Sequence, residues 1–377
     1  MVYLDNSATT VVCKEAIERM VCVMTEQYGN PSSLHTLGID AWREVTRARG
    51  EVAALMGAKP EQVVFTSGGT EANNLAILGG AEAKARQPHV AVTTTIEHPS
   101  VAACFDRLEA QGWTVIRVQP EADGTISPEA IERVCTPDTT LVSVMTVNNE
   151  TGALMDIPSI VTRVRRIAPR ALIHTDAVQA AGKLPIRAGK WGVDLLSVSG
   201  HKLHGPKGVG ALYIRKGVRI LPRVLGGGQE GGLRSGTEPT PAIVGLGAAA
   251  AAMPNLFEQT ALYERLKACL LEELGTHPDV QFHLPQDGVP YIVNLSLSGF
   301  RSETVLHFLA QRGIFVSSGS ACAKGKPSAV LAAMGLSADE IDSSLRISFC
   351  RDNTEEDVHA LCVALREAAQ TLQRRKP

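Results

Sequence analysis

The chain has 377 residues, of which 44% are hydrophobic and 20% charged, and a formal net charge of −2. This length exceeds the size at which one hydrophobic core usually stops growing, and the globular composition excludes a mainly disordered chain. The balanced charge excludes broad electrostatic attraction to nucleic acid or membranes, so we expect the protein to bind neither directly. Because the sequence shows no long apolar run and no signal-like segment, we expect a cytoplasmic protein.

From about residue 14 to residue 250, helical stretches alternate with short apolar runs rich in β-branched residues. This alternation is typical of an α/β fold, with a mostly parallel sheet covered by helices. The predicted strands are 62–66, 90–94, 141–147, 171–175 and 195–199. Each strand ends in polar or glycine residues, and ligands of such sheets bind beyond the carboxyl ends of the strands. We therefore expect the chemistry at these strand ends.

An alanine-rich helix over 243–253 stops at Pro254, and a long amphipathic helix over 258–274 follows it. This break predicts a large domain over residues 14–254 and a small α+β domain formed by residues 1–13 and 255–377. The elements predicted for the small domain, in chain order, are strand 291–297, helix 302–311, strand 314–317, a helix at Ser328, strand 345–349 and a final helix from Thr354.

Eight cysteines without a Cys-x-x-Cys pair indicate neither a disulfide framework nor a zinc site, and we expect no metal. Five lie at helical spacing among apolar residues and are expected to be small buried hydrophobes: Cys22, Cys104, Cys135, Cys269 and Cys362. Cys322 differs, because it lies in a polar loop over about 317–327 with Lys324 and Lys326 close by. Cationic neighbours and exposure favour a reactive thiolate, although a merely solvated loop is the alternative.

Residues 63–74 are predicted to form a strand, a glycine turn and a helix start. Such a turn offers unpaired backbone N–H groups and the positive end of the helix dipole to a phosphate. The indication is weak by itself, because glycines in strand-to-helix turns commonly serve backbone geometry alone.

Two charged residues follow neighbouring predicted strands, Asp176 after 171–175 and Lys202 after 195–199. A lysine that forms a Schiff base must lose its proton, and a pyridine cofactor needs an acid at its ring nitrogen. A helix-capping Asp and a surface Lys are the ordinary alternatives, and Lys207 is a nearby competitor. The order of phosphate turn, strand-end Asp and strand-end Lys nevertheless favours a pyridoxal-phosphate site.

Along nearly its whole length the chain resembles the cysteine desulfurases, the NifS/IscS group of the class V aminotransferase superfamily. The motifs that carry this resemblance are 3–10, 30–33, 66–74, 148–152, 199–208, 234–237 and 317–322. The resemblance implies the fold type I of pyridoxal-phosphate-dependent transferases. It also implies conversion of L-cysteine to L-alanine with transfer of the sulfur to Cys322 as a persulfide.

Residue by residue, the resemblance implies that Lys202 binds pyridoxal 5′-phosphate and that Asp176 partners the ring nitrogen. Gln179 and Asn149 are then neighbours of the ring oxygen or the substrate. The implied phosphate contacts are Gly69, Thr70, Ser199, His201 and, across a homodimer interface, Thr237.

The resemblance also suggests how substrate and protons are handled. His98 matches a histidine that stacks on the cofactor ring, and we interpret it as a proton shuttle because imidazole titrates near neutral pH. Arg346 matches the arginine that binds the substrate carboxylate, with Arg351 as the alternative.

Two questions stay open at this stage. A selenocysteine lyase, or another enzyme of the class V aminotransferase type, is the alternative to a cysteine desulfurase. A sulfur-acceptor protein is also expected, either a cluster scaffold or a tRNA-thiolation enzyme. The loop between Cys322 and Ser328 looks shorter than in the best-known family members, and this departure leaves the acceptor unidentified.

Overall fold

The computed structural model describes residues 1–318 and 328–375. Its large part is built on a seven-stranded sheet in the order β2-β8-β7-β6-β5-β3-β4. The strands are β2 (Val63–Thr66), β3 (Val90–Thr94), β4 (Thr114–Val118), β5 (Thr139–Ser143), β6 (Leu172–Asp176), β7 (Leu195–Ser199) and β8 (Gly210–Ile214). Only β8 runs antiparallel to its neighbours in this sheet, so the other six strands end at one common edge.

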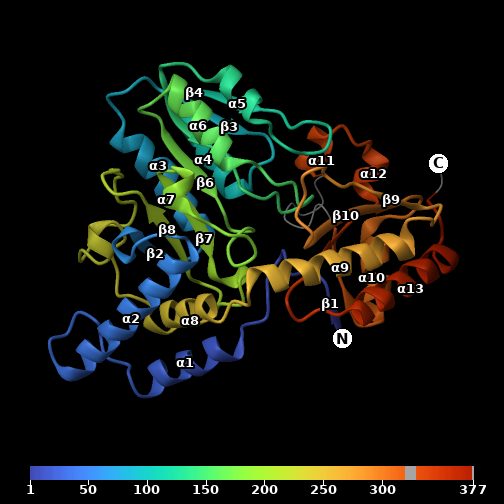
Figure 1. Ribbon diagram of the computed structural model, residues 1–377, viewed down its shortest axis with the longest axis horizontal. Helices are drawn as coiled ribbons and strands as arrows, with labels where there is room; N and C mark the ends of the chain where they lie inside the picture. The colour runs from blue at the N-terminus through green and yellow to red at the C-terminus, as the bar shows by residue number, and fades with distance from the viewer. Residues whose placement is uncertain (319–327, 376–377) are drawn as a thin grey trace.

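Helices cover both faces of this sheet (Figure 1), and apart from the edge strand β4 nearly all strand residues are therefore buried. The helices of the large part are α1 (Lys14–Thr25), α2 (Thr36–Leu55), α3 (Gly69–Ala83), α4 (Pro99–Ala110), α5 (Pro128–Val134), α6 (Ile157–Ile167), α7 (Ala188–Trp191) and α8 (Thr240–Ala251). Neighbouring strand residues point to opposite faces: Leu172 joins the core under α3 and α4, and Ile173 joins the core under α2, α6 and α8.

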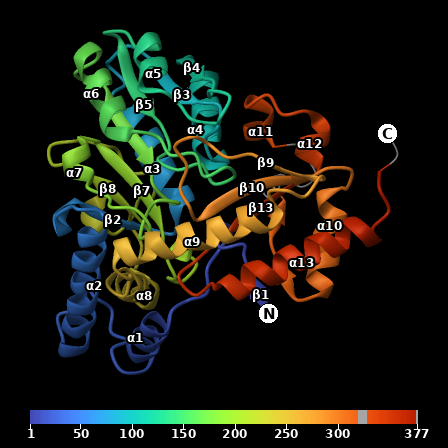
Figure 2. The same ribbon diagram turned by 45° about the vertical axis from the view of Figure 1, so that its right-hand side comes forward.

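The small part is built on a four-stranded antiparallel sheet in the order β12-β13-β10-β9. Its elements are α9 (Leu256–Leu274), β9 (Val280–Phe282), β10 (Ile292–Leu297), α10 (Ser302–Gln311), β12 (Ser317–Ser318), α11 (Ala329–Ala333), α12 (Ala338–Asp342), β13 (Ser344–Ser348) and α13 (Glu355–Thr371). Figures 1 and 2 show α9 running from the large part into the small one and lying beside α13.

The N-terminal segment belongs with the small part. Strand β1 (Val2–Tyr3) pairs in parallel with β11 (Ile314–Phe315), and Asp5 bridges Ser348 at the end of β13. The segment then crosses to the large part, where the N–H of Thr10 donates to the carbonyl of His201 (2.9 Å). Residues 5–10 thus lie between the two parts of the fold.

Several elements differ from the sequence prediction. Strands β4, β8 and β9 and helix α12 were not predicted. The predicted strand 141–147 instead begins at Thr139 and ends at Ser143, and the predicted strand 314–317 divides into β11 and β12, which belong to different sheets. The alanine-rich helix spans Thr240–Ala251 rather than 243–253. Among the described residues no single helix is both long and apolar enough to cross a membrane. One pair of consecutive helices, α8 and α9, reaches that length and apolar composition only when the two are taken together, and the pair is bent by 81°.

Two of the five cysteines predicted to be core residues are only half-buried. Cys104, Cys135 and Cys362 are buried, but Cys22 on α1 and Cys269 on α9 are partly exposed. Each of these two places its sulfur 4.0 Å from a carboxylate one turn further along, on Glu26 and Glu273 respectively.

Candidate active site

A cavity of about 330 Å³ lies at the carboxyl edge of the large sheet. The residues that line it are Ser7, Ala8, Gly69, Thr70, Asn73, His98, Ser100, Met145, Val147, Asn149, Asp176, Val178, Gln179, Ser199, His201, Lys202 and Arg346. They come from strand ends and loops of the large part, from the N-terminal segment and from β13 of the small part. The cavity therefore lies where ligands of open α/β sheets bind.

The turn between β2 and α3 forms one wall of the cavity. Gly68 has a φ of 154°, and Gly69 begins the 15-residue helix α3. A Cβ atom on Gly69 would lie 2.9 Å from Cγ2 of Val178 and 3.5 Å from Cβ of Ser199, so a side chain here would crowd the wall. Because the first N–H groups of a helix have no partner within it, this turn can hold an anionic group.

Asp176 is the buried acid of the site. It is 5% exposed, and its Oδ1 accepts from the N–H of Val178 (2.9 Å) while its Oδ2 accepts from Nδ2 of Asn73 (2.7 Å). Asn73 lies one turn after Gly69 on α3 and uses the same Nδ2 to donate to Oγ of Ser100 (2.9 Å). These bonds hold the carboxylate rigidly at the end of β6.

The same network orients His98. Nδ1 of His98 accepts from the N–H of Ser100 (3.1 Å) and lies 2.7 Å from Oγ of Ser100, whose hydroxyl hydrogen is free to donate because that oxygen accepts from Asn73. The neutral ring therefore carries its hydrogen on Nε2. Burial lowers the pKa of His98, an effect that Asp176 opposes and Lys202 reinforces, so the ring is neutral at neutral pH.

Lys202 lies in the short turn Gly200–Lys202 that follows β7, and its side chain is half-buried in the cavity wall. Its Nζ donates to the carbonyl oxygens of Ser7 and Ala8, the latter at 2.7 Å. The competing lysine, Lys207, is exposed and does not line the cavity. Burial, assisted by the charge on Lys202, lowers the pKa of the neighbouring His201 to about 4.

Arg346 is a buried cation at the small-part side of the cavity, with 3% of its surface exposed. Its Nη1 donates to the carbonyl of Asn149 (3.0 Å), and its Nη2 donates to Oδ1 of Asp5 (2.8 Å). Its Nε has no hydrogen-bond partner among the described residues. Arg351 lies elsewhere, with Nη1 donating to the carbonyl of Ala252 at the end of α8 (2.8 Å).

Four cavity residues carry a buried polar atom without a partner in the described parts of the chain: Oε1 of Gln179, Oδ1 of Asn73, Oγ of Ser7 and Nε of Arg346. Nε2 of Gln179 donates to the carbonyl of Ser7 (3.0 Å), so its amide is fixed. Unpaired buried polar atoms cost free energy unless a ligand satisfies them. A ring with polar substituents and a phosphate therefore fits this set of residues.

Among the described residues, Thr237 is the one predicted site residue that is not brought to the cavity, and it is exposed. Cys322 falls outside the described residues. Conversely, the predicted roles did not include Ser7, Asn73 or Ser100. Asn73 could have been found from its helical spacing of four after Gly69, which places both residues on one face.

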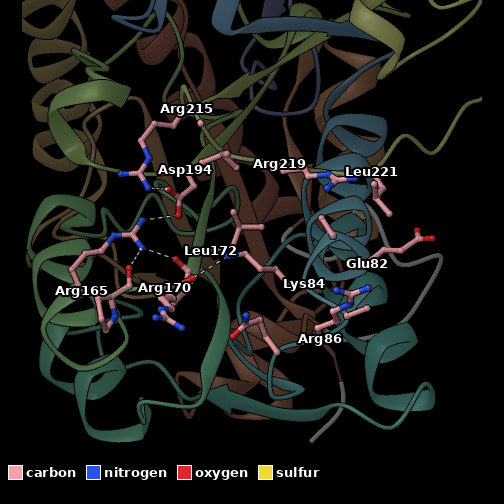
Figure 3. A pocket seen from close by; sticks show the side chains of 17 residues that line it. Glu82, Lys84, Arg86, Arg165, Arg170, Leu172, Asp194, Arg215, Arg219 and Leu221 are labelled. Carbon is pink, nitrogen blue, oxygen red and sulfur yellow. Dashed lines mark hydrogen bonds and ion pairs between the residues drawn. The ribbon is translucent and has the colours of Figure 1, made fainter.

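A larger cavity, of about 740 Å³, lies at the opposite edge of the sheet, where the chain enters β6 and leaves β8 (Figure 3). Its wall is rich in basic residues, two of which, Arg165 and Arg215, pair with the buried Asp194. None of the predicted site residues that the structure describes lines this cavity.

Comparison with known proteins shows the family. Residues 2–361 match the family described as aminotransferase class-V. A cysteine desulfurase of Trichormus azollae is 40% identical over 385 residues, which cover 100% of this chain and 95% of the relative.

Solved structures agree with this match. A NifS-like protein has a TM-score of 0.93 at 37% identity and covers 98% of this chain and 100% of its own. A structure described as SspA in complex with cysteine has a TM-score of 0.82 at 34% identity and covers 93% and 99%. The chain therefore belongs to the aminotransferase class-V family and, within it, to the group of cysteine desulfurases and NifS-like proteins.

Proposed function

We propose that this protein is a cysteine desulfurase that uses pyridoxal 5′-phosphate to convert L-cysteine to L-alanine and that receives the sulfur on Cys322. The observation that carries the proposal is the meeting of Lys202, Asp176 and Arg346 in one cavity. An amine, a buried carboxylate and a buried guanidinium are the groups needed to hold the cofactor carbonyl, its ring nitrogen and an amino-acid carboxylate.

The cavity residues fit the cofactor group by group. The β2–α3 turn with Gly69 and Thr70, together with Ser199 and His201, would hold the phosphate, and Asp176 would accept from the protonated ring nitrogen. Gln179 has an oriented amide with an unpaired oxygen for the polar ring edge. Pyridoxal 5′-phosphate supplies an electron sink for the carbon from which the amino-acid α-proton leaves.

Arg346 would bind the substrate carboxylate. Its guanidinium plane is fixed by Asp5 and by the carbonyl of Asn149, and its Nε–H remains available. A buried guanidinium with an unused donor binds a carboxylate through charge-assisted hydrogen bonds. The α-carbon of a bound cysteine is thereby held in one orientation.

Lys202 and His98 would handle the protons. Nζ of Lys202 lies in the cavity wall against two carbonyl oxygens, and once deprotonated it can take the α-proton of the substrate. His98 carries its hydrogen on Nε2, so its neutral imidazole can donate a hydrogen bond from Nε2 to the reacting groups.

Cys322 would carry the sulfur chemistry. Its thiolate attacks the sulfur of the bound cysteine, a sulfur–sulfur bond forms and the carbon–sulfur bond of the substrate breaks. The electron pair of the broken bond stays with the carbon part, which takes up a proton and leaves as alanine. The balance is one L-cysteine and one thiol giving one L-alanine and one persulfide, with no external oxidant.

A homodimer is part of the proposal. Ile17, Val21 and Met24 follow helical spacing along α1 and are each about half exposed (49%, 48% and 52%), and Trp42 on α2 is 54% exposed. Such an apolar stripe on adjacent elements is typical of an interface. Thr237 is exposed outside the cavity of its own chain, as a residue must be if it reaches the phosphate of a second copy.

A persulfide has to be discharged, so we extend the proposal to a thiol-bearing acceptor protein for cluster assembly or tRNA thiolation. The acceptor would meet Cys322, whose polar loop carries two lysines. A selenocysteine lyase is the competing activity, but the similar proteins named above include a cysteine desulfurase and a NifS-like protein, and a third, SspA, is in complex with cysteine.

The test is to incubate the purified protein with L-cysteine and a reductant and to quantify alanine and sulfide, with L-selenocysteine run in parallel. Equal amounts of alanine and sulfide are expected. Lys202→Ala should lose turnover and the visible absorption of the bound cofactor, whereas Lys207→Ala, which changes an exposed lysine of the same loop, should keep both. Alanine without sulfide, or turnover by Lys202→Ala at the parent rate, would contradict the proposal.

A further inference from the structure

Behind the cavity, three side chains with metal-binding atoms come together from two loops. His204 follows Lys202 by two residues, and Cys350 and Asp352 follow β13, the strand that carries Arg346. One donor atom from each residue lies within 4.8 Å of the other two. His204 and Cys350 are buried and Asp352 is exposed, so the cluster has a closed side and an open side.

The imidazole of His204 is held in the form that metals bind. Its Nδ1 lies 3.0 Å from the carbonyl oxygen of Val11, which can only accept, so Nδ1 carries the hydrogen. The lone pair is then on Nε2. A histidine that donates one ring N–H to a backbone carbonyl and presents the other nitrogen is the usual arrangement in metal sites.

The backbone of His204 adopts a left-handed conformation, with a φ of 61°, which is uncommon for a residue with a side chain. Two hydrogen bonds maintain it: the N–H of His204 donates to Oγ1 of Thr10 (2.8 Å), and its carbonyl accepts from the N–H of Cys13 (2.9 Å). Because strained backbone persists only where the surroundings enforce it, this conformation marks a candidate functional position.

The loop that carries Cys350 and Asp352 is equally well fixed. The N–H of Cys350 donates to Oδ1 of Asn353 (2.8 Å), and the N–H of Asn353 returns a bond to the carbonyl of Cys350 (3.2 Å). The amide of Asn353 is bound in turn by Asn6 (3.1 Å) and by the carbonyl of Tyr3 (3.0 Å). The sulfur and the carboxylate are thus presented by a turn anchored to the N-terminal segment.

We propose that His204, Cys350 and Asp352 form a site for a divalent cation of the zinc type. One sulfur, one imidazole nitrogen and one carboxylate oxygen are ligands that zinc accepts, at bond lengths of about 2.3, 2.0 and 2.0 Å. Such bonds put tetrahedral ligand atoms about 3.5 Å apart, so atoms that already lie within 4.8 Å need only a small approach. The exposed side at Asp352 leaves the fourth position to water.

Two cations lie near the cluster, of which Arg351 is bound elsewhere and Lys183 has no hydrogen-bond partner among the described residues. Arg351 donates Nη1 to the carbonyl of Ala252. Nζ of Lys183 lies 4.9 Å from the centre of the Tyr291 ring. The thiolate and the carboxylate together supply two negative charges, which match a divalent ion.

The metal would join the two parts of the fold. His204 belongs to the loop of Lys202, and Cys350 to the chain that leaves the strand of Arg346, so one ion would hold these two elements together. This site lies outside the proposed catalytic chemistry, and its occupation can be measured whether or not the protein turns over cysteine. Its signature is tighter coupling of the two parts, seen as an increase in Tm.

The experiment uses holoenzyme that has been stripped with EDTA, kept in a phosphine reductant without thiols and titrated with Co²⁺. One equivalent should bind per chain, with ligand-field bands at longer wavelengths than the cofactor absorbs and a thiolate-to-cobalt charge-transfer band. Cys350→Ser should abolish the charge-transfer band and weaken binding by more than about 100-fold, beyond the cost of losing an outer-shell partner. His204→Gln should weaken it similarly.

Asp352→Asn changes an exposed side chain and serves as the variant that keeps the fold, with an expected loss of about tenfold or more in Co²⁺ affinity. Cys22→Ser and Cys322→Ser are the matched thiol controls and should retain the parent spectrum. Zn²⁺ should displace Co²⁺ and raise the Tm of the parent but not of Cys350→Ser. An unchanged cobalt spectrum in Cys350→Ser, loss of that spectrum in Cys322→Ser, or no stoichiometric binding by the parent would each overturn the proposal.

Discussion

At the scale of single residues, burial decides the protonation of Glu97, the neighbour of His98. Its Oε1 accepts from the N–H of Met145 (2.8 Å) and from the hydroxyl of Thr94 (3.1 Å), but its Oε2 has no partner among the described residues. Burial, assisted by the negative charge of Asp176, raises the pKa of Glu97 to about 8 from its ordinary 4.5. The carboxyl group is therefore protonated at neutral pH.

This protonation predicts a pH dependence of stability. Between pH 4.5 and about 8 the folded protein keeps the proton of Glu97 and the unfolded chain releases it, so the contribution of this residue falls as the pH rises through that window. Glu97→Gln should remove this pH dependence of stability. Between pH 5 and pH 8 its free energy of unfolding should therefore rise by roughly 2–4 kcal/mol relative to that of the parent. Urea unfolding at both pH values measures this, with the exposed Glu61→Gln as control. Parallel pH profiles for parent and Glu97→Gln would contradict the assignment.

Arg346 and Arg351 can be separated by kinetics. Arg346→Ala should raise the KM for cysteine by about 10–100-fold with a smaller effect on kcat, because a carboxylate contact kept throughout the reaction contributes uniform binding. Arg351→Ala removes a bond to the end of α8 and should lower the Tm without a comparable change in KM. Steady-state rates and thermal unfolding of both variants distinguish a substrate-binding role from a structural one. A larger increase in KM for Arg351→Ala than for Arg346→Ala would assign the binding of the substrate carboxylate to Arg351.

A Cys322 variant tests whether substrate binding can be separated from the proposed sulfur chemistry. Cys322→Ala should keep the cofactor and the spectral change on adding L-cysteine, because neither needs a protein thiol. Alanine and sulfide should almost vanish, and the protein should not gain a sulfur atom. Peptide mass spectrometry after brief exposure to cysteine under non-reducing conditions checks this. Alanine formation at the parent rate, or added sulfur on another cysteine, would contradict the role.

At the scale of elements, the start of α3 is built for a group close to the backbone. Gly69→Ala would place a Cβ atom 2.9 Å from Val178 and should weaken binding of pyridoxal 5′-phosphate by about tenfold or more. Gly50 is the matched control, because it lies inside α2 and a Cβ atom added there would meet no atom within 4 Å. Gly50→Ala should raise stability by about 0.5–1 kcal/mol and leave cofactor affinity unchanged.

Cofactor titration of the stripped protein, followed by its absorption, measures both glycine variants. Equal affinity for Gly69→Ala and the parent would remove the turn from the proposed phosphate site. A loss of affinity in Gly50→Ala would instead show that general destabilisation, rather than crowding of the turn, explains the result.

At the scale of the whole molecule, the apolar stripe on α1 and α2 predicts a dimer. Met24→Glu or Trp42→Glu should shift the protein toward the monomer and weaken cofactor binding, because Thr237 of a second copy would no longer complete the phosphate site. Phe257→Glu changes a residue that is 83% exposed on α9 and should leave the dimer intact. Sedimentation at several concentrations gives the assembly state. A monomeric parent with full cofactor affinity would exclude this interface.

The sequence alone was sufficient for features that depend on neighbours along the chain. Hydrophobic periodicity indicated β3, β7 and α10 within their observed bounds, and the strand-end positions of Asp176 and Lys202 placed both at one edge of the sheet. These inferences succeed because strand alternation, helix spacing and turn residues act over a few residues.

Only the tertiary structure decided which distant groups meet. Strand β8 forms by antiparallel pairing with β2 and β7, whose residues come from separate segments, so no local pattern predicts its place. The same holds for the bond from Asn73 to Asp176, for the pairing of Arg346 with Asp5 and for the cluster of His204 with Cys350. Burial depends on the packing of the complete fold, so the raised pKa of Glu97 also became visible only there.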